Sequence, residues 1–75
     1  MSSEQLHEPR EVLSAQVLDK HRAIVSLMEE LEAVDWYGQR VEGCQDDELR
    51  AILIHKRDEE PEHAAMVIEW LRRHD

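Results

Sequence analysis

Two long stretches of apolar residues at helical spacing, joined by one short turn signal, constrain the fold of this sequence most. Apolar side chains recur every three or four positions from Leu13 to Val41, and the same spacing returns from Leu49 to Leu71. Gly43 is typical of a helix end, and the Asp46–Asp47 pair is typical of the N-cap of a following helix. No segment alternates as a strand does, so we predict an all-α antiparallel helical hairpin.

The expected boundaries follow from the residues that start and stop helices. We predict a single domain, 1–75, with a flexible arm at 1–8, a first helix at 9–43 and a second helix at 46–74. Pro9 is tolerated in a first helical turn, and Ser14 offers an alternative start as an N-cap. Pro61 falls inside the second helix, where it removes a backbone hydrogen bond to the Arg57 carbonyl and predicts a kink.

A hairpin this short is expected to need a partner. Two helices make one layer of contact, and 75 residues bury too little surface to stabilise a fold easily. Cys44 is the single cysteine, so no disulfide can form within the chain, and a reducing cytosolic setting is indicated. We therefore expect a homodimer in which two hairpins form a ferritin-like four-helix bundle.

The charge of the chain excludes some partners. It carries 18 acidic and 9 basic residues, for a formal net charge of −9, and no basic patch. Nucleic-acid binding is therefore not expected. Neither is membrane association, because no apolar run approaches the roughly 20 residues that span a bilayer and the N-terminus lacks a signal-peptide core. The acidic surface is suited to gathering cations, or serves solubility alone.

Three polar residues fall where the apolar pattern predicts burial. Glu60 and His63 interrupt the apolar stripe of the second helix, three positions apart and hence on one face. Glu30 lies among apolar neighbours in the first helix. Glu30 and Glu60 are both 15 residues from Gln45, so a turn there places both about 22 Å from it, at the same level of the hairpin.

This group suggests a metal site that one chain supplies only in half. Carboxylates and imidazole are suitable iron ligands, and di-iron bundles take one Glu from each of two helices and a Glu-x-x-His from each of the other two. Two alternatives remain open. Glu60 and His63 could form an interface pair, with Lys56 as counter-charge, in a non-catalytic helical dimerisation module. The same ligands could also hold Zn or Mn without turnover.

Several segments resemble the encapsulated ferritins, the cargo proteins of encapsulin nanocompartments. The similar stretches span nearly the whole chain and are residues 3–9, the segment SLMEELEAVDWY at 26–37, residues 58–66 and the closing 69–73. The resemblance implies a ferroxidase that oxidises Fe(II) to Fe(III) at a di-iron centre between two subunits and feeds iron storage. It also implies a homodimer within a ring-shaped decamer, an encapsulin shell partner, and a location in the cytoplasm inside the nanocompartment.

The resemblance further implies roles for individual residues. Glu30, Glu60 and His63 of both chains would bind the iron, with Tyr37 beside the centre. An outer entry site falls on Glu29, Glu32 and Trp36, and a peripheral metal site falls on His55, Glu59 and Glu62. The family continues past Arg73 into a short helix and a shell-docking tail that this sequence does not include.

Overall fold

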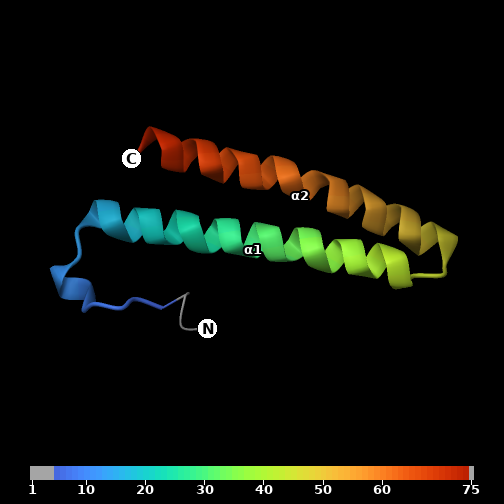
Figure 1. Ribbon diagram of the computed structural model, residues 1–75, viewed down its shortest axis with the longest axis horizontal. Coiled ribbons are helices and arrows are strands. Elements are labelled where there is room, and N and C mark those ends of the chain that lie inside the picture. The colour runs from blue at the N-terminus through green and yellow to red at the C-terminus, as the bar shows by residue number, and fades with distance from the viewer. Residues whose placement is uncertain (1–4, 75) are drawn as a thin grey trace.

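The computed structural model describes residues 5–74 and shows two long antiparallel helices side by side (Figure 1). A short 3-10 turn, η2 (Arg10–Val12), precedes α1 (Ala15–Gly43) and α2 (Asp47–Arg73). No strand occurs in this part of the chain, so the expected all-α hairpin is confirmed. Residues 1–4 of the expected arm lie outside the described residues.

The first helix starts at Ala15 and not at residue 9. Leu13 is extended, with φ −97° and ψ 138°, and separates η2 from α1. The Ser14 side chain then accepts a hydrogen bond of 3.1 Å from the backbone N–H of Val17 and satisfies one of the free donors at the helix start. The alternative start at Ser14 is therefore the one adopted, because the cap outweighs the helical tendency of the residues before it.

The turn between the helices is short and closed by side chains. Asp46 caps α2 by accepting from the backbone N–H of Leu49 at 2.8 Å. Arg50 Nε donates to the carbonyl oxygen of Val41 at 3.1 Å, which satisfies one of the last carbonyls of α1. Gly43 ends α1 without a left-handed conformation, since no described residue has a positive φ.

The second helix runs through Pro61 without interruption. A single α-helix extends from Asp47 to Arg73 and includes this proline. Its missing N–H costs one intrahelical hydrogen bond, but the turns on either side keep the helix intact. Glu60 and His63 therefore stay on one continuous helix.

The hairpin is one helix thick. Its Cα extents are 51 × 26 × 12 Å, and only Val41 and Ala64 are buried among the apolar residues described. Large apolar side chains are exposed on both helices, including Ile24 and Leu31 on α1 and Ile52 and Met66 on α2. Each broad face is thus open. No helix in the described part of the chain is both long and apolar enough to cross a membrane.

Candidate metal centre

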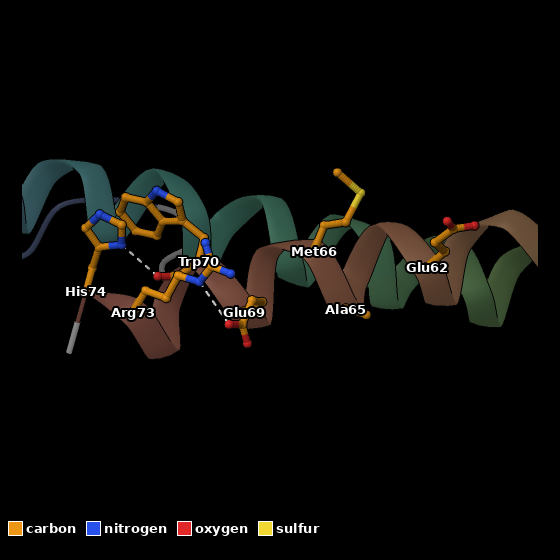
Figure 2. Close-up of a pocket in the computed structure, with 7 residues that line it drawn as sticks. All are labelled: Glu62, Ala65, Met66, Glu69, Trp70, Arg73 and His74. Carbon is orange, nitrogen blue, oxygen red and sulfur yellow. Dashed lines mark hydrogen bonds and ion pairs between the residues drawn. The ribbon is translucent and has the colours of Figure 1, made fainter.

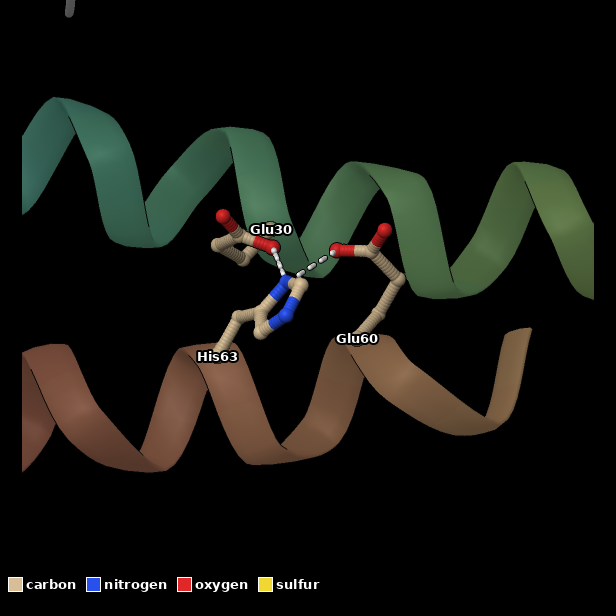
Figure 3. Close-up of side chains that lie close together, drawn as sticks. All are labelled: Glu30, Glu60 and His63. Atoms are coloured by element: carbon tan, nitrogen blue, oxygen red, sulfur yellow. Dashed lines mark ion pairs between the residues drawn. The ribbon is translucent and has the colours of Figure 1, made fainter. Parts of the chain in front are cut away.

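Glu30 from α1 and Glu60 and His63 from α2 meet between the two helices (Figure 3). His63 Nδ1 lies 3.5 Å from a carboxylate oxygen of Glu30 and 3.6 Å from one of Glu60. One potential ligand atom from each residue lies within 4.8 Å of the others. Among residues 5–74, no other three His, Cys, Asp or Glu side chains approach one another in this way.

Helix geometry explains why these three side chains converge. Glu60 and His63 are three residues apart and project from the same face of α2. The short turn and the equal spacing from it bring Glu30 to the same level on α1. The two carboxyl groups lie deeper than the imidazole, with side chains 28% exposed for Glu30, 15% for Glu60 and 50% for His63. The cluster is therefore open to one broad face of the hairpin.

The close approach of Glu30 and Glu60 disfavours a negative charge on both carboxyl groups at once. Sharing a hydrogen bond with Glu60 is the main cause that raises the pKa of Glu30 above its ordinary value. Partial burial and the Glu60 charge act in the same direction, while His63 acts against them. A bound cation would remove this conflict, because it pairs with both carboxylates at once and favours the release of the shared proton.

The donor set fits iron chemically. Two carboxylates and one imidazole are hard or borderline ligands of the kind that bind Fe(II) and Fe(III). Three residues are half of the four Glu and two His that a di-iron bundle uses. The alternative counter-charge, Lys56, is exposed and forms no ion pair with either carboxylate among the interactions of the described residues.

The residues expected beside the centre are partly shielded or turned to solvent. Tyr37 is half-buried, and the Arg40 guanidinium lies 5.0 Å from the centre of its ring, a cation–π contact that the sequence pattern did not predict. Trp36 is 50% exposed, and Glu29 and Glu32 are exposed. A single hairpin thus presents these three residues on its surface.

The expected peripheral site is only partly assembled in one chain. His55 Nε2 lies 3.8 Å from a carboxylate oxygen of Glu59, one helical turn away. Glu62 does not join them within the distance that unites Glu30, Glu60 and His63. The i, i+4 and i+7 spacing places the three residues on one face, but the longer step of seven residues separates Glu62 from His55 by two turns.

The fold and the cluster together define a class: helical hairpins that hold carboxylate and imidazole donors between their two helices. Comparison with known proteins identifies the family. A model of the EncFtn-like family matches residues 5–75. A Rhodospirillum rubrum protein named encapsulated ferritin-like protein is 66% identical over 74 residues, which cover 99% of this chain and 53% of that protein. The chain belongs to the encapsulated ferritin-like family.

Two further similarities agree with this assignment. A Myxococcus xanthus protein named encapsulin nanocompartment cargo protein EncC is 39% identical over 46 residues, covering 61% of this chain and 35% of that protein. A crystal structure of a Nitrosomonas europaea protein matches with a TM-score of 0.89 and 63% identity, over 93% of this chain and 77% of that one. The chain spans about half the length of the Rhodospirillum rubrum protein, at 53%.

Proposed function

We propose that the chain is a ferroxidase subunit that oxidises Fe(II) to Fe(III) at a di-iron centre built between two copies. The observation that carries this proposal is the convergence of Glu30, Glu60 and His63 at one level of an open hairpin. Membership of the encapsulated ferritin-like family supports the same reading. A second copy facing the first would supply the remaining ligands and cover the exposed apolar residues.

The carboxylates, the imidazole and the phenol of this site would have different roles in the reaction. The carboxylates of Glu30 and Glu60 bind the ferrous substrate and offset the charge that rises when each iron loses one electron to dioxygen. His63, fixed between two carboxylates, sets the orientation of its ring nitrogen toward the metal. Tyr37 lies about two turns along α1 from Glu30 and would orient a ligand or supply an electron.

The remaining sites and partners belong to the same proposal. Glu29, Glu32 and Trp36 would form an outer site that gathers iron, and His55, Glu59 and Glu62 a peripheral one. The hairpin is too thin to enclose a mineral, so the oxidised iron would be stored elsewhere. The names of relatives that mention encapsulation and an encapsulin cargo support delivery to an encapsulin compartment. The ring-shaped decamer rests on the family resemblance of the sequence alone.

Replacement of Glu30 tests the proposal directly. Glu30→Ala should abolish rapid Fe(II) oxidation, followed by oxygen uptake and Fe(III) absorbance, while circular dichroism shows unchanged helix content. Glu42→Ala is the matched control, because Glu42 is an exposed acidic residue of the same helix, away from the cluster. Oxidation as fast in Glu30→Ala as in Glu42→Ala would contradict the assignment. Metal binding without oxygen uptake in the unaltered chain would leave a metal-binding module only.

A further inference from the structure

Within residues 5–74, Arg40 is the one helical arginine whose guanidinium group contacts an aromatic ring and makes no hydrogen bond or ion pair. Its central carbon lies 5.0 Å from the centre of the Tyr37 ring. The other arginines of α1 and α2 donate to a carboxylate or a carbonyl, as Arg73 does to Glu69 at 3.0 Å (Figure 2). These others are Arg22, Arg50, Arg57 and Arg72. In a chain with 18 acidic and 9 basic residues, an arginine that contacts a ring instead of an acid needs a specific explanation.

The ring that Arg40 covers belongs to the stripe of α1 that carries a candidate metal ligand. Tyr37 follows Glu30 by seven residues, so the two side chains lie on one side of the helix, about 10 Å apart along its axis. Because Cα–Cβ bonds tilt toward the N-terminus of a helix, the Tyr37 side chain starts in the direction of Glu30. Arg40 approaches the half-buried ring from the side of the turn. Along α1, Tyr37 therefore lies between a candidate metal ligand and a fixed positive charge.

The positive charge of Arg40 affects how readily Tyr37 loses an electron. A cation is attracted to the negative face of an aromatic ring, and removal of an electron from the ring weakens this attraction. The contact therefore stabilises the phenol relative to the tyrosyl radical. Arg40 is exposed and lines an open hollow with Trp36 and Gln39, so water screens part of its charge. At exposed sites such a contact changes an equilibrium constant by about two- to fivefold.

The acidic residues nearest to Arg40 along α1 leave its charge over the ring. Asp35 accepts a hydrogen bond from Gln39 at 3.1 Å. Glu42 is exposed and forms no ion pair among the described residues. A guanidinium group also keeps its proton at every pH at which the protein is folded. The cation over Tyr37 is therefore a constant feature of the folded chain.

We propose that Arg40 is a positioning residue that keeps Tyr37 in its reduced phenol form, an inference whose consequence for the reaction rests on the proposed function. Two roles were open to Tyr37, namely orienting a ligand and supplying an electron, and the cation favours the first. The electrons that reduce dioxygen then come from Fe(II) alone, one from each iron. The phenol keeps its proton and remains a hydrogen-bond donor beside the centre.

Radical transfer in the metal-free protein tests the effect of Arg40 without any iron chemistry. Pulse radiolysis in azide solution generates the azide radical, a neutral oxidant that takes one electron from an aromatic side chain and becomes the azide anion. The resulting radical is shared among Trp36, Trp70 and Tyr37, and its tyrosyl and tryptophanyl forms differ in absorbance. Formation of the tyrosyl radical releases the phenol proton to water. Tyr37 is the single tyrosine of the chain, so all tyrosyl absorbance reports on this residue.

Arg40→Met should raise the ratio of tyrosyl to tryptophanyl radical about two- to fivefold over the unaltered chain. Arg40→Lys keeps a cation beside the ring and should give a ratio closer to that of the unaltered chain than to that of Arg40→Met. Arg22→Met is the matched control and should leave the ratio unchanged, because it removes the same charge from an arginine of α1 that pairs with Asp19. Equal ratios in Arg40→Met and Arg22→Met would overturn the inference. So would a ratio in Arg40→Lys as high as that in Arg40→Met.

Turnover of the unaltered chain separates this inference from the proposed function. Fe(II) mixed with dioxygen should be oxidised without a tyrosyl signal in electron paramagnetic resonance spectra. A tyrosyl signal that rises together with the Fe(III) absorbance would show that Tyr37 supplies an electron, which would overturn the inference and leave the ferroxidase activity in place. Absence of any Fe(II) oxidation would contradict the proposed function, and the radical ratio in metal-free protein would still decide the effect of Arg40.

Discussion

At the scale of single residues, the raised pKa of Glu30 gives the stability of the metal-free fold and the affinity for metal opposite dependences on pH. In the metal-free chain, the raised pKa of Glu30, caused chiefly by its hydrogen bond to Glu60, means that the folded state holds a proton that the unfolded state releases. The folded state therefore loses stability as pH rises from the ordinary value of 4.5 through the raised pKa. The same rise in pH should strengthen binding of Fe(II), since the ligand must be deprotonated.

Glu30→Gln isolates this effect, because glutamine is neutral at every pH and can still donate a hydrogen bond to Glu60. We expect the free energy of unfolding of the metal-free unaltered chain to fall, relative to this variant, as pH rises from the ordinary pKa of 4.5 through the raised pKa of Glu30. Urea unfolding in the presence of a chelator measures the difference, with Glu42→Gln as the exposed control. A constant difference across this range would contradict the raised pKa of Glu30.

At the scale of elements, two capped helices hold the ligands, and the weak point is Pro61. α2 continues through this proline although it lacks the N–H that would bond to the carbonyl of Arg57. The helix is held on both sides by its own ladder and by contact with α1 around buried Ala64. Proline therefore weakens the element that carries Glu60 and His63 without breaking it.

Replacing Pro61 by alanine should stabilise the hairpin by about 1 to 3 kcal/mol, because a helix-interior proline costs about 3 kcal/mol relative to alanine. Urea unfolding monitored by circular dichroism at a fixed protein concentration checks this. Pro9→Ala is the control, since Pro9 precedes η2 and lies outside both helices. Its replacement should bring no gain, because a loop proline restricts the unfolded chain. Equal effects of the two substitutions would show that the helical position of Pro61 does not matter.

At the scale of the whole molecule, the slab of two helices has two broad faces and almost no core. Val41 and Ala64 are the buried apolar residues among those described, so the stability of the hairpin depends on what covers its faces. Ile52 and Ile24 are similarly exposed, at 55% and 47%. Ile52 lies three turns before His63 on the same side of α2, whereas Ile24 shares the stripe of Val17 and Leu31 on the other side of the hairpin.

This contrast predicts which substitution weakens the proposed dimer. Ile52→Asn should remove about 1 to 2 kcal/mol of apolar burial per chain and raise the dissociation constant at least about tenfold. Sedimentation of metal-free protein over a concentration series measures the change. Ile24→Asn is the matched control and should leave the dissociation constant unchanged, because Ile24 lies on the side of the hairpin away from His63. A raised dissociation constant in Ile24→Asn alone would place the interface on the other side of the hairpin.

The sequence by itself determined the helix starts and the level of the candidate metal ligands along the hairpin, because both depend on local rules. Ser14 and Asp46 mark the helix starts because their side chains accept hydrogen bonds from backbone donors only three residues away. The common level of Glu30, Glu60 and His63 follows equally from local geometry, because each residue advances a helix by a fixed 1.5 Å. The helix start predicted at residue 9 differs from the structure, because Leu13 is extended and no feature of the sequence around it indicates this conformation.

Only the tertiary structure decided how these residues are placed around the hairpin. The rotation of α1 against α2 sets the depth of the two carboxyl groups, the half-exposed position of His63 and the hydrogen bond that raises the pKa of Glu30. The physical reason is that helical rise is a property of one segment, whereas burial and side-chain contact depend on how two segments pack.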